Sequence, residues 1–144
     1  MQPKKYKPKV DKLFFIICIP TNILLLGVLF LAFLEPSMFF VTVPIFAFCN
    51  YFLISPLFGY VELRDDEIFI KYGFFMKKSI PYSKIRGLVR ERRWYSESMM
   101  SLKNAMEHVI IKYNSFDVTT VSVVDNEDFV REVEDRILSK RDRS

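Results

Sequence analysis

Two long runs without a charged residue decide what this 144-residue chain can fold into. Leu13 to Leu34 and Phe39 to Tyr60 each hold 22 uncharged residues. The hydrocarbon core of a bilayer is about 30 Å thick, and a helix needs about 20 apolar residues to cross it. Because lipid offers the backbone no hydrogen-bond partner, each run is expected to be helical. We therefore predict two membrane spans, residues 13–34 and 39–60, joined as an antiparallel hairpin by residues 35–38.

The charges at the N-terminus predict the orientation of this hairpin. Residues 1–12 hold five lysines and one aspartate, a net charge of +4, whereas residues 61–144 are nearly balanced. Because positive residues are retained in the cytoplasm, we expect a multi-pass protein of the cell (inner) membrane with both termini cytoplasmic. The regions are then a basic cytoplasmic tail (1–12), the transmembrane hairpin (13–60) and a cytoplasmic domain (61–144). A positive excess confined to the tail does not indicate nucleic-acid binding.

Some features of the apolar half have alternative interpretations. A cleaved signal peptide would explain the first run, but the run exceeds an apolar signal core of about 7–15 residues and no cleavage motif follows. Asn22 is expected near a membrane surface, whereas Asn50 either lies near a surface or makes a polar contact between helices, including those of a homo-oligomer. Cys18 and Cys49 have no neighbouring cysteine, so we expect packing residues rather than a disulfide or metal site.

From Tyr60 onward, apolar and polar residues alternate with a period of two, which is typical of strands. The predicted strands are residues 60–63, 68–72, 74–80, 85–93, 107–113 and 118–124. The alternation is imperfect in the fourth strand, where Gly87 predicts a β-bulge. Short strands joined by such tight turns predict an antiparallel meander.

The last element is predicted to be an amphipathic helix. Phe129, Val133 and Ile137 recur every four residues and form one apolar stripe that must pack on the sheet. Asp125 or Asn126 can cap its N-terminus. The predicted fold class is therefore an α+β membrane protein, in which a two-helix transmembrane hairpin precedes an antiparallel β domain closed by a C-terminal amphipathic helix.

The spacing of apolar residues carries a family resemblance over residues 60–138. It consists of Ile70, Gly73, Ile80, Pro81 and Ile85, the strand Ala105 to Tyr113, and Val121, Ser122 and Phe129. This pattern resembles the short bacterial pleckstrin-homology (PH) domain family, YyaB-like. The resemblance implies a PH-like fold, often preceded by one or two membrane spans. Some relatives look like self-immunity proteins against secreted antimicrobial peptides.

The sequence shows no catalytic, cofactor or metal motif. His108 is the only histidine, and we expect it to be a half-exposed strand residue, because no triad partner is visible. Asp65, Asp66 and Glu67 lack the spacing and glycine of a calcium loop, so a solvated hairpin turn is expected. The chain has only four glycines, and we find no phosphate loop or nucleophile elbow. We therefore predict neither enzyme activity nor a cofactor.

A run of cations beside aromatic residues is the best candidate for a functional surface. This basic–aromatic cluster consists of Lys84, Arg86, Arg90, Arg92, Arg93, Trp94 and Tyr95. Such residues suit anionic lipid headgroups, at about 1 kcal/mol per charge near the surface, or a protein partner. The alternative is an ordinary solvated strand, because charge runs usually face water.

These observations predict a membrane-anchored, PH-like binding or scaffold module at the inner face of a bacterial membrane, without catalysis. Its expected partners are the lipid bilayer and a protein, and nucleic acid is not expected. The alternative is a bacteriocin self-immunity protein, in which the hairpin and the domain block a peptide toxin at the membrane.

Overall fold

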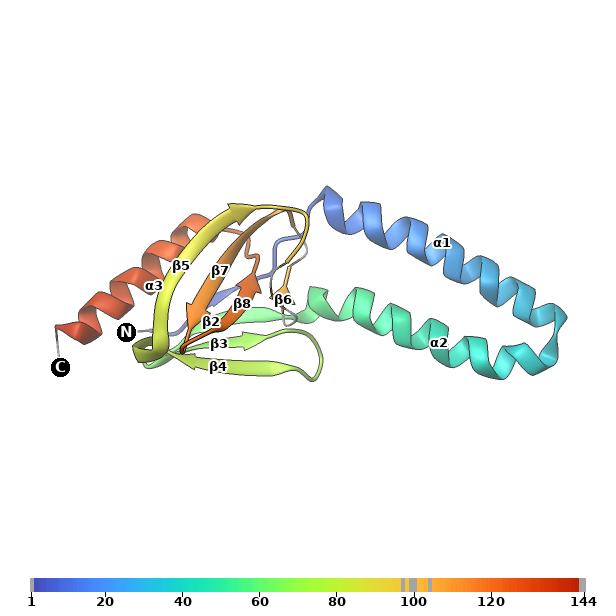
Figure 1. The fold of residues 1–144 in the computed structure, drawn as a ribbon, viewed down its shortest axis with the longest axis horizontal. Helices are drawn as coiled ribbons and strands as arrows, with labels where there is room; N and C mark the ends of the chain where they lie inside the picture. The colour runs from blue at the N-terminus through green and yellow to red at the C-terminus, as the bar shows by residue number, and fades with distance from the viewer. Residues whose placement is uncertain (1, 97, 99–100, 104, 143–144) are drawn as a thin grey trace.

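The computed structural model describes residues 2–96, 98, 101–103 and 105–142. Two long helices run side by side away from a β domain (Figure 1). Helix α1 is Lys12–Leu34 and helix α2 is Pro36–Ile54, followed by a 3₁₀ turn, η1 (Ser55–Phe58). Both helical segments are long and apolar enough to cross a membrane, and neither is buried along its most apolar stretch.

The turn between the helices is shorter than predicted. Only Glu35 separates α1 from α2, because α2 begins at Pro36 rather than at Phe39. Proline fits the first turn of a helix, where its missing N–H costs no hydrogen bond. At its other end α2 stops at Ile54, and the first strand after it starts at Tyr60.

The polar side chains inside the helices bond to their own backbone. The side-chain amide of Asn22 donates to the carbonyl oxygen of Cys18 (2.9 Å), and that of Asn50 donates to Phe46 (3.1 Å). Each amide thus finds an acceptor one helical turn earlier, and Asn50 needs no contact between helices to be accommodated. Cys18 and Cys49 are free thiols in α1 and α2.

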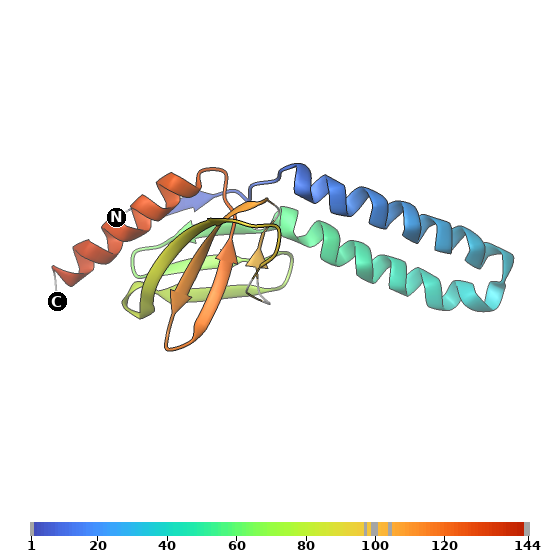
Figure 2. The same ribbon diagram turned by 45° about the horizontal axis from the view of Figure 1, so that its top comes forward.

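The domain consists of two four-stranded sheets and a C-terminal helix, α3 (Asn126–Arg141) (Figures 1 and 2). The sheet orders are β1-β2-β3-β4 and β5-β7-β8-β6, and β6–β8 is the one parallel pair among the described strands. The strands are β1 (Lys4–Tyr6), β2 (Tyr60–Leu63), β3 (Glu67–Lys71), β4 (Lys77–Pro81), β5 (Ile85–Arg92), β6 (Ser101–Leu102), β7 (Glu107–Tyr113) and β8 (Asp117–Val121). This architecture confirms the predicted α+β fold class.

Strand β1 makes the N-terminal segment, predicted as a basic tail, part of the domain. It pairs antiparallel with β2, and Pro8 forms an isolated bridge with Val123. The buried Tyr6 packs edge-on against Phe129 of α3, with 5.3 Å between ring centroids. The strand is hidden in the sequence because only Tyr6 of its three residues faces the core.

Helix α3 covers the core as its apolar stripe predicts. Phe129 and Val133 are fully buried, and Ile137 packs against the same core. The carboxylate of Asp125 accepts a hydrogen bond from the backbone N–H of Asp128 (2.9 Å), which confirms the predicted N-cap.

A buried arginine joins α3 to the N-terminal half of the domain. The side chain of Arg136 is only 3% exposed and pairs with Glu132 at 3.0 Å. It also donates to the carbonyl oxygens of Leu63, Arg64 and Gln2, at 3.4, 3.1 and 2.8 Å. These bonds satisfy the guanidinium and hold together the helix, the β2–β3 corner and the residue before β1.

The predicted third strand begins later than expected. Residues 74–76 form a turn instead, and β4 starts at Lys77. The N–H of Tyr72 donates to the carbonyl of Met76 (2.8 Å), which closes the turn and leaves residues 74–76 outside the ladder. The irregularity expected in the fourth strand is confirmed, because the register of β5 shifts between Ile85 and Gly87.

The expectation of a half-exposed His108 is wrong. Its residue is 1% exposed, and ring nitrogen Nδ1 lies 3.0 Å from the carbonyl oxygen of Met106. Strand β7 lies between β5 and β8, and its residues 108–111 are all buried. Both faces of this strand are therefore covered, although alternation alone assigns one of them to solvent.

Candidate functional site

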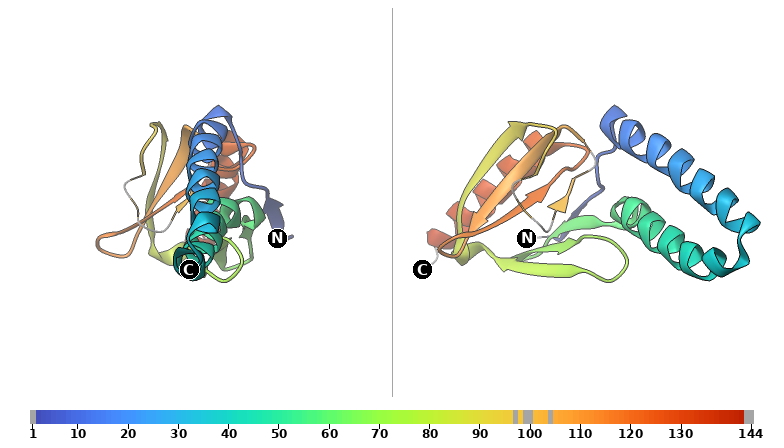
Figure 3. Two further views of the ribbon diagram at one scale, coloured as in Figure 1. Left: turned by 90° about the vertical axis from the view of Figure 1, so that its right-hand side faces the viewer. Right: turned by 45° about the vertical axis from the view of Figure 1, so that its right-hand side comes forward.

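Strand β5 lies at the edge of the second sheet. It pairs with β7 on one side, and no described strand pairs with its other side. Figure 3 shows β5 along the rim of the domain, with α3 behind it in the right-hand view. An unpaired edge offers a row of backbone N–H and C=O groups to another extended chain.

The basic–aromatic cluster is exposed throughout, but it extends along the whole of this strand. In order, its residues are Lys84 in the 3₁₀ turn η2 (Tyr82–Lys84), Arg86, Arg90 and Arg92 on β5, and Arg93, Trp94 and Tyr95 just after it. At about 3.3 Å per residue the eight residues of β5 span roughly 26 Å, and the strand runs toward the helical hairpin (Figure 1). The far end (Lys84 and Arg86) and the near end (residues 92–95) therefore have different surroundings.

The near end is held by backbone contacts. The ammonium group of Lys103 donates to the carbonyl oxygens of Arg93 and Tyr95, and burial lowers the pKa of Lys103. The Arg93 guanidinium pairs with Glu91 at 3.2 Å and donates to the hydroxyl of Tyr95 at 2.9 Å. Trp94 is left 71% exposed.

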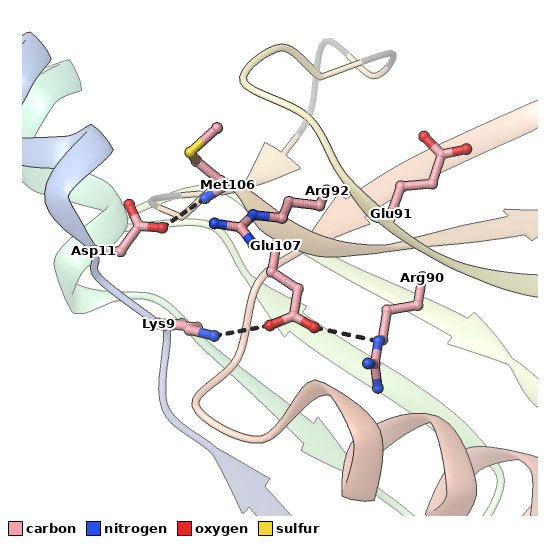
Figure 4. Close-up of a pocket in the computed structure, with 7 residues that line it drawn as sticks. All are labelled: Lys9, Asp11, Arg90, Glu91, Arg92, Met106 and Glu107. Atoms are coloured by element: carbon pink, nitrogen blue, oxygen red, sulfur yellow. Dashed lines mark hydrogen bonds and ion pairs between the residues drawn. The ribbon is translucent and has the colours of Figure 1, made fainter.

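A charged groove lies beside the second half of β5. It has a volume of about 530 Å³ and is lined by Lys9, Asp11, Arg90, Glu91, Arg92, Met106 and Glu107 (Figure 4). The Glu107 carboxylate lies between two cations, 3.0 Å from Lys9 Nζ and 3.2 Å from Arg90 Nε. The hydrogen bond from Lys9 lowers the pKa of Glu107, and the charge of Arg90 adds to the effect.

Arg92 is a cation of this groove whose charge helps to lower the pKa of Glu107. It makes no hydrogen bond or ion pair with any other described residue, and its guanidinium lies between Asp11 and Glu107 in Figure 4. The Glu91 carboxylate points away from the groove in the same view. A guanidinium can bind a carboxylate or phosphate with two parallel hydrogen bonds.

Asp11 joins this groove to the first helix. One carboxylate oxygen accepts from the N–H of Leu13 (2.8 Å) and caps α1, and the other accepts from the N–H of Met106 (2.8 Å). The N–H of Lys9 donates to Ser122 at 2.9 Å. Asp11 therefore bonds both to the first turn of α1 and, at Met106, to the segment that precedes β7.

A second groove, lined by both apolar and charged side chains, flanks the first half of β5. It has a volume of about 270 Å³ and lies between β5 and α3, lined by Ile85, Arg86, Gly87, Leu88, Glu134, Ile137, Leu138 and Arg141. Leu138 is 57% exposed, and a Cβ on Gly87 would have no atom within 4 Å. Apolar side chains of a bound segment could enter here while charged ones meet Arg92.

In the part of the chain that the structure describes, no group of three or more His, Cys, Asp or Glu side chains could hold a metal ion. The sequence pattern identifies the cations of β5 but not Lys9, Asp11 and Glu107. Those residues come from distant segments, and only the pairing of β5 with β7 and of the N-terminal segment with the sheet brings them together.

A family model described as "Bacterial PH domain" matches residues 59–137, more than half of the chain. The match runs from the residue before β2 into α3 and leaves out β1 and the hairpin. No curated protein and no solved structure matches the chain.

Proposed function

Because this chain belongs to the bacterial PH-domain family, we propose that it is a binding module without catalytic activity. The hairpin holds it at the inner face of a bacterial cytoplasmic membrane. The lysines before α1 favour a cytoplasmic N-terminus. The pairing of β1 with β2 supports an even number of crossings, since both strands must lie on one side of the bilayer to bond.

The partner is an extended, acidic segment of another protein that adds to the open edge of β5. The observation that carries this proposal is an unpaired edge strand with Arg86, Arg90 and Arg92 along it. In such strand addition, main-chain hydrogen bonds supply affinity and flanking pockets supply specificity. Charges and a bulge on an edge strand also guard against unwanted pairing, so the experiment must separate the two roles.

The near end of the basic–aromatic cluster has a second contact, the anionic lipid surface. Trp94 and Tyr95 belong to the residue types enriched at membrane interfaces. Arg92 and Arg93 add about 1 kcal/mol each where they approach anionic headgroups. The far end of β5 is left for the protein segment.

The test uses the full-length chain in its own membrane, with a photo-crosslinking residue in place of Val89 on β5. We expect a protein adduct that is lost when Arg86→Glu and Arg92→Glu are combined. Lys112→Glu, an exposed charge reversal on β7, is the matched control and should keep the adduct. High salt should weaken it. Adducts that ignore the two reversals, or adducts to lipid alone, would refute strand addition by an acidic partner.

Self-immunity, the alternative from the sequence, is the competing outcome. Protection of a sensitive strain against a secreted peptide, unchanged by Arg86→Glu with Arg92→Glu, would favour it over the binding module.

A further inference from the structure

The turn between β3 and β4 carries apolar side chains where a loop usually carries polar ones. Phe74 is 44% exposed, Phe75 81% and Met76 48%. The turn is closed by the bond between Tyr72 and Met76, so its side chains project from a fixed hairpin rather than from a loose loop. We propose that this turn is a third membrane contact, with Phe74, Phe75 and Met76 inserted into the lipid interface beside α2.

The turn packs on the last part of the membrane-capable segment. The Tyr51 ring of α2 lies 5.8 Å from the Phe74 ring and 6.0 Å from the Phe75 ring, between centroids. The Phe58 ring lies 4.7 Å from Phe74. The hydroxyl oxygen of Ser55 accepts a hydrogen bond from the N–H of Phe74 at 3.2 Å. These contacts set the turn at the depth of residues 51–58, where α2 and η1 leave the apolar segment.

Figure 1 shows the same relation in the ribbon. The β3–β4 turn reaches from the domain toward the hairpin, next to the end of α2. A chain that places α2 in the bilayer therefore brings this turn to the membrane surface. An aqueous partner would have to enter between the turn and the bilayer to cover it.

The charges around the turn match an anionic surface. Lys71 precedes it and Lys77 and Lys78 follow it, and the nearest acidic residue along the chain is Glu67. Long basic side chains can keep their stems on apolar surface while their ammonium groups reach the headgroups. An apolar tip with basic flanks is the pattern of segments that lie in the membrane interface.

Another exposed aromatic residue provides an internal comparison. Phe116 is 95% exposed in the turn between β7 and β8, which lies at the end of the domain away from the hairpin (Figures 1 and 2). No aromatic contact of Phe116 is found among the described residues. Phe75 and Phe116 are thus alike in chemistry and exposure but differ in their distance from the membrane.

The test places a single tryptophan at each position in the full-length chain. Trp94, the only tryptophan, is first changed to Phe, and Phe75→Trp, Phe116→Trp or Phe30→Trp is then added. Each protein is reconstituted in vesicles of phosphatidylcholine and phosphatidylglycerol, with and without brominated acyl chains. Emission maxima, quenching by brominated lipid and quenching by aqueous acrylamide are measured. Aromatic replacements keep the packing of the turn, and circular dichroism checks the fold.

We expect the Phe75→Trp emission to be blue-shifted, quenched by brominated lipid and protected from acrylamide. The Phe116→Trp emission should be that of a tryptophan in water, quenched by acrylamide alone. Equal acrylamide quenching at both positions would overturn the inference. A blue-shifted Phe75→Trp that brominated lipid does not quench would also overturn it, because protein, such as a second copy of the chain, would then cover the turn.

The inference rests on the proposed crossing of the membrane by the hairpin, but not on the partner of β5. The Phe30→Trp variant in α1 shows whether the membrane contact of the turn has failed alone or together with the membrane anchor. Quenching of Phe30→Trp without quenching of Phe75→Trp would sink the third contact alone. Absence of quenching at both positions would sink the membrane anchor as well.

Discussion

Gly59 sits where the hairpin meets the domain, between η1 and β2, and the structure leaves no room there for a side chain. A Cβ built on it would lie 2.5 Å from the carbonyl oxygen of Lys71 and 3.3 Å from that of Pro56, and it would also meet Leu102 Cδ1. Its φ of −74° is ordinary for any residue. The demand for glycine is therefore a matter of close approach, not of backbone conformation.

The cost of Gly59→Ala follows from the distance to Lys71. Ordinary contact begins at 3.4 Å, so the two backbones must separate by about 0.9 Å, and such overpacking costs about 1–3 kcal/mol. Lys71 pairs with Tyr60 at the end of the β2–β3 ladder, so the shift strains the sheet. Each kcal/mol lowers the unfolding midpoint of a small domain by about 4–8 °C, which predicts a decrease of about 4–24 °C.

Thermal unfolding of the full-length protein in detergent, followed by Trp94 fluorescence, measures this decrease. Gly87→Ala is the matched control, because nothing lies within 4 Å of its added Cβ, and its midpoint should stay close to that of the parent. Adding Leu102→Ala to Gly59→Ala should not restore stability, since the backbone carbonyl remains in place. Equal midpoints for Gly59→Ala and Gly87→Ala would refute the steric argument.

Three further changes test contacts that hold the domain together, and Arg131→Ala is the control for the first of them. Arg136→Ala removes the donor from three carbonyl oxygens, so denaturant unfolding should show a loss of about 2–4 kcal/mol. Arg131→Ala, a 75% exposed side chain, should cost less than about 0.5 kcal/mol. The hydrogen bond from Lys4 holds the pKa of Asp128 at about 2, below its usual 3.8, so this stabilisation is complete above pH 3.8 and is lost as the pH falls toward 2. Asp128→Asn should remove that part of the acid unfolding curve; an unchanged curve would contradict the assignment. Deletion of residues 2–7 should lower the unfolding midpoint, because it removes β1 from the sheet. An unchanged midpoint would show instead that these residues are a solvated tail.

The hairpin could be predicted from sequence because a long uncharged run has few stable structures open to it. An uncharged run of 22 residues is the right length for a bilayer, and the helix follows from the backbone's need for hydrogen bonds. The sequence prediction starts this helix three residues late, at Phe39, because it assigns Pro36 to the turn rather than to the first position of the helix. Element boundaries are the weakest part of such predictions.

The strand predictions agree with the structure where one face of a strand packs on the core, because apolar and polar residues then alternate along it. Alternation fails at residues 74–76, which are apolar but lie outside the sheet, where the rings of Phe74 and Phe75 contact Tyr51 of α2. A sequence pattern records that a side chain avoids water, not whether core or lipid covers it. It also fails for β6, whose two residues pair with β8 across a long separation.

Only part of the candidate surface could be predicted from the sequence. Seven residues close together in the chain suggested one patch, but an extended strand spreads Lys84 and Tyr95 to opposite ends of the domain. The groove that receives Arg92 depends on Lys9 and Glu107, and no local pattern relates those positions. The edge position is likewise a property of the assembled sheet, since the sequence of β5 does not distinguish an edge strand from an inner one.

The pairing of β1 with β2 also dictates an order of assembly. Residues 4–6 leave the ribosome before both apolar helices, whereas their partners, residues 61–63, leave after them. In the proposed topology, β1 can therefore pair with β2 only after both helices have been made and residues 61–63 have returned to the side of the membrane that holds residues 4–6. A hairpin that inserted only its first helix would strand Gln2 and Lys4 across the bilayer from Arg136 and Asp128, their bonding partners. If the hairpin crosses the membrane as proposed, completion of the sheet therefore depends on insertion of both helices, and a molecule with one helix inserted would keep an incomplete domain.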